Sequence, residues 1–296
     1  IPNKRKKHVS PTAYTGGLAI SFAYVVSLLL FDIGQKLNLI MSISFLMAIV
    51  GFVDDKYNLN VGGKLSLQVI PIIYLVILEN LSLSQIGDYN YFKLELNSFS
   101  IPFTLLSILF LINSFNYFDG LDGLLGYTTI SVLSILIFLL PNENFKIFLI
   151  IILIPLLFFL FFNFSIFKLP KLFLGDSGSL LLGFIIAFTL IFIAVEKLVH
   201  PILLAFSVSI FVYEFLSINL IRLKNKKNVF VAGQDHLHHY LFRNTKSIFK
   251  TNLFISLSNI ILFIIGYISF LLISPLASLI IFVFLFLLYF ILRNKY

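Results

Sequence analysis

About ten apolar stretches, most of them long enough to cross a lipid bilayer as a helix, dominate this chain of 296 residues. A helix rises 1.5 Å per residue, so about 20 apolar residues span a hydrocarbon layer of about 30 Å. The stretches lie at 13–31, 37–53, 65–79, 99–115, 123–140, 145–164, 179–195, 198–221, 249–272 and 274–292. Hydrophobic residues make up 59% of the sequence and charged residues 11%, which excludes an ordinary soluble domain. The sequence therefore predicts an all-α polytopic integral membrane protein.

The basic residues are distributed unevenly among the loops. If successive loops alternate between the two sides, all of the 21 Lys and Arg fall on one face except Lys36, Lys93, Lys146 and Lys197. Positive charge collects in the cytoplasmic loops of membrane proteins, so we expect this face to be cytoplasmic. We expect residues 1–296 to form a single transmembrane domain, with cytoplasmic loops near 1–12, 54–64, 113–123, 165–178 and 222–248. Because the net charge of +8 resides in these loops, it indicates topology and phosphate binding, and no nucleic-acid partner is expected.

Three further features bound the architecture. Residues 91–97 alternate apolar and polar side chains, which predicts a short extracytoplasmic strand or hairpin. Cysteine is absent, which excludes disulfides, thiolate metal sites and cysteine nucleophiles. The chain begins at Ile1 within a basic loop, and we expect a further helix upstream.

Six polar patches interrupt the apolar chain, and all of them fall on the predicted cytoplasmic rim. They are 4–8, 54–55, 113–123, Asn163, 175–178 and 235–239. Ionisable groups at the rim of a membrane bundle are usually functional. Carboxylates, amides and histidines gathered on one rim therefore indicate chemistry at that rim.

Asp54 and Asp55 directly follow an apolar run, at the end of an expected helix. One interpretation is a solvated helix end. The helix dipole disfavours acidic residues at a C-terminus, however, and the positive-inside rule does not explain them. A pair of carboxylates placed there suits a metal ion, a general base or a cationic partner.

Asn113, Asn116, Asp119 and Asp122 recur at every third position. Successive members are neighbours on a helix, but a continuous helix would turn the last one away from the first. The segment therefore either unwinds at Gly120 and Gly123 or presents its groups to two different ligands. A polar turn between two spans is the alternative interpretation.

Of the last two patches, the first places an acidic residue at a helix start and the second is a histidine cluster. Residues 175–178 open an apolar helix, so Asp176 either caps that helix or holds a divalent cation beside a diphosphate. His236, His238 and His239 lie in a basic loop. Their spacing does not match a usual zinc site, and phosphate recognition by ring N–H donors fits better.

The patches occur in an order that resembles a known family. Lys6-Lys7-His8 with Pro11 to Gly17, Gly51 to Asp55, Asn113 to Leu124, Phe173 to Ser179 and His236 to His239 are similar to the motifs of the polyprenyl-phosphate N-acetylhexosamine-1-phosphate transferases. This is glycosyltransferase family 4, and the histidine motif is most similar to that of the undecaprenyl-phosphate N-acetylglucosamine-1-phosphate branch. The family fold has eleven transmembrane helices, which fits about ten here and a missing first one.

The resemblance implies an enzyme of the bacterial inner membrane with its active site facing the cytoplasm. Such an enzyme uses Mg²⁺, or Mn²⁺ in its place, to move a sugar 1-phosphate from a UDP-N-acetylhexosamine to polyprenyl phosphate, and it releases UMP. The expected donor is UDP-N-acetylglucosamine. Another N-acetylhexosamine, such as a deoxy sugar, or phospho-N-acetylmuramoyl-pentapeptide is the alternative. A homodimer is the assembly that we expect for such an enzyme.

The resemblance also implies a role for each polar group. Asp54 and Asp55, with His238 and His239, would be catalytic, and Asp176 and Asn116 would hold the metal ion. The substrates would contact Asp119, Asp122, Asn163, Phe173, His236, Lys7, His8, Lys64 and Asn113, with Phe173 stacked on the uracil. Two mechanisms remain open, direct attack by the lipid phosphate aided by Asp54 and a covalent aspartyl intermediate. A secondary transporter is the alternative of another class, but transporters place ionisable groups near the bilayer midplane.

Overall fold

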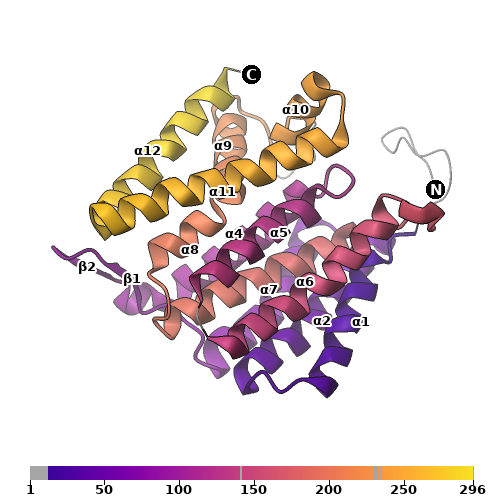
Figure 1. The fold of residues 1–296 in the computed structure, drawn as a ribbon, viewed down its shortest axis with the longest axis horizontal. Helices are drawn as coiled ribbons and strands as arrows, with labels where there is room; N and C mark the ends of the chain where they lie inside the picture. Colours follow the sequence, from indigo (N-terminus) through magenta and orange to yellow (C-terminus); the bar gives the residue numbers. More distant parts are fainter. Residues whose placement is uncertain (1–12, 141, 230–232, 234, 296) are drawn as a thin grey trace.

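The structure, a computed structural model, describes residues 13–140, 142–229, 233 and 235–295. It confirms an all-α membrane architecture, and each of the ten apolar stretches forms a helix or a pair of helices (Figure 1). The helices are α1 Gly16–Leu30, α2 Gln35–Tyr57, α3 Val61–Ile73, α4 Ser100–Phe118, α5 Leu124–Leu139, α6 Glu143–Asn163, α7 Gly175–Val195, α8 Pro201–Ser207, α9 Ser209–Lys224, α10 Leu237–Thr245, α11 Ile248–Leu272 and α12 Pro275–Asn294. A π-helical turn, Tyr74–Leu78, extends α3, and single 3-10 turns occupy Asn97–Phe99 and Ile166–Lys168.

Length separates these helices into groups. Seven of the described helical segments are long and apolar enough to cross a membrane, and the pair α8 and α9 counts as an eighth if it is one broken span. Helices α1 and α5 are apolar but shorter, at 15 and 16 residues. The chain is therefore a multi-pass membrane protein.

The stretch 198–221 differs from a simple span because it contains a break. Helices α8 and α9 meet at Val208 with a bend of 74°. Asn259 of α11 satisfies the freed backbone: its amide nitrogen donates to the Ser207 carbonyl at 2.8 Å, and its Oδ1 accepts from the Ile210 amide at 3.3 Å. Backbone groups at membrane depth need such partners, because lipid offers none.

Helix α7 forms the centre of the bundle and is buried along almost its whole length. It packs against α1, α2 and α4. Small residues make this approach close, since a Cβ at Gly17 would collide with the backbone of Gly178 and one at Gly51 with that of Asp176. Close packing through small residues is a main source of helix association in membranes.

The two ends of the bundle differ in character. One end, called here the basic face, carries the segments 58–60, 119–123, 164–174, 225–229 and 235–247 together with the C-terminal end of α12. The opposite end carries a two-stranded antiparallel hairpin, β1 Gln85–Asp88 and β2 Lys93–Glu95. The predicted hairpin is thus confirmed, and its first strand begins before residue 91.

Two predicted loops are shorter than expected because helices continue through them. Helix α2 runs to Tyr57, so Asp54 and Asp55 lie on its last turns. Helix α4 runs to Phe118, so the chain unwinds only from Asp119, and Gly123 adopts a positive φ of 70°. Of the two alternatives for this segment, the structure shows the unwinding.

Candidate active site

Two carboxylates from different helices meet one lysine at the basic face. Lys64 Nζ lies 2.7 Å from Asp54 Oδ2 and 2.6 Å from Asp176 Oδ2. Asp54 is buried, and its Oδ1 accepts from the Leu59 amide at 2.9 Å. The cluster joins the end of α2, the first turn of α3 and the start of α7. An ammonium group held between two carboxylates shows that this position favours positive charge.

Asp176 does not cap its own helix, contrary to one of the two sequence interpretations. Helix α7 begins after Leu174 without a side-chain cap. The carboxylate of Asp176 instead accepts from Asn116 Nδ2 at 3.0 Å, and the same nitrogen lies 2.8 Å from Ser179 Oγ. The free helix start is occupied by Asp55 of α2, whose Oδ2 accepts from the Ser177 amide at 3.3 Å. A carboxylate at a helix N-terminus is stabilised by the helix dipole.

Gly175 is required for this arrangement. Its φ is +70°, a conformation that other residues rarely adopt, and a Cβ there would lie 2.5 Å from Asp55 Oδ2. The glycine lets the chain turn into α7 while the carboxylate stays in contact.

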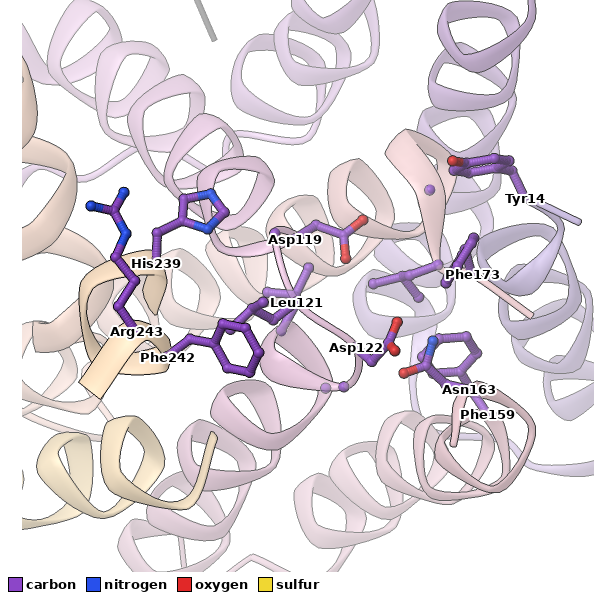
Figure 2. A pocket seen from close by; sticks show the side chains of 16 residues that line it. Tyr14, Asp119, Leu121, Asp122, Phe159, Asn163, Phe173, His239, Phe242 and Arg243 are labelled. Carbon is purple, nitrogen blue, oxygen red and sulfur yellow. The ribbon is translucent and has the colours of Figure 1, made fainter. Parts of the chain in front are cut away.

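Beside this cluster lies a cavity of about 550 Å³ (Figure 2). It is lined by the turn 119–123, by residues 173–175, by the end of α6 and by one face of α10. Figure 2 shows Asp119 and Asp122 on the turn, with Tyr14, Phe173 and Asn163 on one side of them and His239 and Arg243 on the other. The walls therefore join motifs more than 100 residues apart in the sequence, and the lining also includes the apolar residues Leu125 and Phe159.

Asp119 and Asp122 differ in their surroundings. Lys171 Nζ lies 2.6 Å from Asp122 Oδ2, and Asn252 Nδ2 donates to the Asp122 carbonyl at 2.8 Å. Asp119 opens onto the cavity, yet the surrounding protein desolvates its carboxyl and the carboxylate of Asp176 repels its charge. Together these effects raise the pKa of Asp119.

Asn163 and Phe173 form the aromatic and amide side of the cavity. Asn163 Nδ2 donates to the Leu172 carbonyl at 2.8 Å, while its buried Oδ1 has no partner in the described structure. The ring of Phe173 lies 5.4 Å from that of Tyr14, with Lys171 Nζ 5.1 Å from the Phe173 centroid. A flat ring beside an unused amide oxygen suits a planar heterocycle with a ring N–H.

The three histidines are brought together on α10 and in the turn before it. His236 and His238 stack with ring centroids 5.5 Å apart, and His238 Nε2 is buried without a described partner against Gly120. His239 lines the cavity. Burial lowers the pKa of each imidazole, so at neutral pH they act as neutral rings with one N–H donor.

The structure leaves some predicted residues apart from the cluster. Asn113 turns its amide to its own helix and donates to the Leu109 carbonyl at 2.7 Å. Lys7 and His8 lie outside the described residues. In the described ranges, no three His, Asp or Glu side chains converge as a metal site of their own.

Sequence reasoning missed the residues that hold α10 in place. Glu214 of α9 accepts from the Leu237 amide at 2.7 Å and from both Nε and Nη2 of Arg293, at 2.9 and 3.0 Å. Tyr289 Oη also donates to it, at 2.8 Å. The available signal was an acid inside an apolar stretch, which is a functional hypothesis by default.

Fold and site together define a multi-pass membrane protein with a polar site at one end of its helix bundle. Residues 37–194 match the family described as Glycosyl transferase family 4, and the chain belongs to that family. The matched range includes the Asp54, Lys64 and Asp176 cluster and ends before α10.

Two curated relatives extend the similarity. One, from Bacillus subtilis (strain 168), is a "Probable undecaprenyl-phosphate N-acetylglucosaminyl 1-phosphate transferase"; it is 28% identical over 248 residues, which cover 81% of this chain and 68% of the relative. The other, from Escherichia coli O157:H7, is an "Undecaprenyl-phosphate alpha-N-acetylglucosaminyl 1-phosphate transferase"; it is 24% identical over 251 residues, which cover 82% of this chain and 68% of the relative.

Proposed function

We propose that this chain transfers an N-acetylhexosamine 1-phosphate, with N-acetylglucosamine as the expected sugar, from its UDP derivative to undecaprenyl or another polyprenyl phosphate. The observation that carries the proposal is the pair Asp54 and Asp176 bridged by Lys64 at the edge of the cavity. The names of both relatives and the family membership support the reaction class. By the positive-inside rule, the basic face would lie on the cytoplasmic side of the bacterial inner membrane.

In this reaction an oxygen of the lipid phosphate attacks the phosphorus that carries the sugar. A new P–O bond forms, the bond between the two phosphates of the nucleotide breaks, and UMP leaves with the electron pair. Several negative charges converge, so fixed positive groups must offset their repulsion. Lys64 would supply one such charge, and Asp54 would align the lipid phosphate or take a proton from it.

A divalent cation fits the donor set, and we include Mg²⁺, with Mn²⁺ able to replace it, in the proposal. Asp176 would hold it with Asn116, whose amide nitrogen is engaged while its oxygen remains an acceptor. Mg²⁺ prefers oxygen ligands and commonly uses one or two carboxylates together with substrate phosphates. When bound, it would neutralise charge on the diphosphate.

The remaining cavity groups would bind the nucleotide sugar. Phe173 would stack on the uracil, with Asn163 and Asp122 at its edge and Asp119 nearer the reacting phosphates. His236, His238 and His239 would donate N–H groups to phosphate or sugar oxygens, and Lys7 and His8 remain candidates for phosphate contacts. Of the two mechanisms we propose direct attack by the lipid phosphate, and a covalent aspartyl intermediate stays the alternative.

A transporter is less well supported. The broken span α8 and α9 is the feature that resembles transporter architecture. Its break is satisfied by the neutral side chain of Asn259, whereas the ionisable cluster lies at the basic face. A homodimer also remains a prediction, checked by the mass of the purified protein in detergent.

The deciding experiment incubates purified protein with undecaprenyl phosphate and a panel of UDP-sugars and follows UMP. We expect UMP release that requires Mg²⁺ or Mn²⁺ and falls at least about 100-fold in Asp54→Asn and Asp176→Asn, because each change removes charge at the reacting phosphates. Asp32→Asn, an exposed acid at the opposite end, is the matched control. Full activity in both site variants, or transport of substrate without UMP release, would refute the proposal.

A further inference from the structure

A second cavity, of about 570 Å³, opens at the basic face on another side of α10. It lies where the last turns of α9 and α12 approach α10, and Figure 1 shows these ends side by side near the C-terminus. Its charged lining residues are Arg222, Lys224, Lys227, Asp235, Arg243 and Arg293. Five of the six are basic, so the cavity carries positive charge that the proposed reaction does not use.

The inner wall of this cavity is rigidly built. Arg222 is buried and bidentate to Asp235, with nitrogen to oxygen distances of 3.0 and 2.7 Å. This pairing holds the pKa of Asp235 down, at about 2, so the pair stays charged. Arg293 is also buried and donates to the Asp235 carbonyl at 2.6 Å. Asp235 and Glu214 neutralise the charge of these two arginines, whose role here is to form the wall of the cavity.

The mouth of the cavity carries the uncompensated charge. Lys224 and Lys227 are exposed, and neither forms an ion pair in the described part of the chain. Asp235 and Glu214 balance the charges of Arg222 and Arg293. The excess positive charge at the mouth of the cavity therefore comes from Lys224 and Lys227. Two ammonium groups before a fixed polar wall suit a phosphate-bearing anion.

The same cavity lies at the end of α12, whose last residues Arg293 and Asn294 line it. Helix α12 has only 6% of its apolar window buried. The aliphatic residues that line it are Ile218 and Ile221 of α9. These two transmembrane helices end at the basic face, where the polar headgroups of one leaflet would lie. A cationic pocket at the headgroup level, beside a helix with little buried surface, therefore suits the anionic headgroup of a phospholipid whose acyl chains lie in the bilayer.

We propose that this second cavity binds the headgroup of an anionic membrane phospholipid. The phosphodiester would lie between Lys224 and Lys227, with its acyl chains toward the exposed apolar surface of α12. Basic pockets between transmembrane helices bind anionic headgroups in this way. Arg243 lines both cavities, and His236, which the proposed function assigns to the substrate, lines the second, so an occupied headgroup site would adjoin the proposed active site.

The test titrates the full chain in neutral detergent with phosphatidylglycerol or phosphatidylcholine and counts bound lipids by native mass spectrometry. Wild type should bind phosphatidylglycerol in preference. The variant Lys224→Gln/Lys227→Gln should bind it about 30-fold more weakly, as expected for the loss of two charges near the membrane surface. Lys246→Gln/Lys250→Gln removes the same charge from the basic face outside both cavities and should leave binding unchanged.

A second measurement does not depend on mass spectrometry. Phosphatidylglycerol should raise the Tm of wild type and of the control more than that of Lys224→Gln/Lys227→Gln, because a ligand stabilises the folded state that binds it. Equal phosphatidylglycerol binding by all three proteins would overturn the proposal, as would an equal loss in the control. A third measurement uses inorganic phosphate in place of the lipid. If phosphate binds by calorimetry and needs the two lysines while phosphatidylglycerol does not, the site takes a free anion and the lipid assignment is wrong.

Discussion

Lys64 and Asp176 are 112 residues apart in the chain, yet Lys64 Nζ and Asp176 Oδ2 lie 2.6 Å from each other between α3 and α7. The same ammonium group contacts Asp54 on α2 at 2.7 Å. One side chain thus ties together three helices of the proposed site.

We expect Lys64→Met to reduce UMP release by about 100-fold or more, because a fixed charge near the transferred phosphate is lost. Lys64→Arg should retain part of the activity, since it keeps the charge but not the geometry. Initial rates at saturating substrates measure the effect. Lys56→Met, an exposed basic residue at the end of α2, is the control and should stay near wild type.

Gly120→Ala tests whether the turn 119–123 and the histidines work as one unit. A Cβ at Gly120 would collide with His238 Nε2, so the imidazole must move. We expect kcat/KM to fall about 10-fold or more with little change in Tm, because a displacement of about 1 Å near reacting groups is costly. Gly62→Ala is the control, since its Cβ would lie 3.6 Å from Asn60 Oδ1 in ordinary contact. An unchanged kcat/KM would show that His238 does not act through this turn.

Glu214→Gln should destabilise the protein strongly. The change leaves the buried guanidinium of Arg293 without its counter-charge, and breaking one partner of a buried pair costs about 3–5 kcal/mol. The double variant Glu214→Gln/Arg293→Met should recover part of the loss, because it removes the uncompensated charge. Thermal unfolding in detergent measures both. Additive losses in the double variant would contradict a direct coupling.

Asn259→Leu should lower the Tm, because the backbone at the break between α8 and α9 loses its partners. Leaving buried polar groups unsatisfied costs about 1–3 kcal/mol. Asn219→Leu is the matched control, since Asn219 Nδ2 donates to the Phe215 carbonyl within its own helix. A loss no larger than in the control would refute the role of Asn259.

His200 predicts a pH effect at the end opposite the basic face. Its Nδ1 accepts from the Ile202 amide at 3.2 Å, and its Nε2 lies 2.9 Å from the Asp88 carbonyl, so Nε2 carries the proton and the ring is neutral. Burial lowers the pKa of this imidazole. A depressed folded pKa means that the unfolded chain binds the proton first, so stability falls as the pH drops below about 6.5. The Tm of wild type should decline there, and that of His200→Gln should decline less.

Several features of the site could be read from residues alone. Acids and amides between apolar stretches, such as Asp54, Asn116 and Asp176, were recognisable because the membrane penalises them unless they have a function. The hairpin near residue 91 followed from alternation. The expected loop near 113–123 was too long, because polar residues at a membrane rim resemble a loop, whereas α4 continues to Phe118.

Hydropathy and charge determined the membrane class, the ten apolar stretches and the common face of the polar patches. These are local properties, since each depends on the composition of one segment and on the alternation of successive segments. Only the tertiary structure decided that Lys64 lies between Asp54 and Asp176, that Asp55 occupies the start of α7, and that Glu214 anchors α10. Those contacts join helices distant in sequence, and their geometry depends on how closely the helices pack around α7.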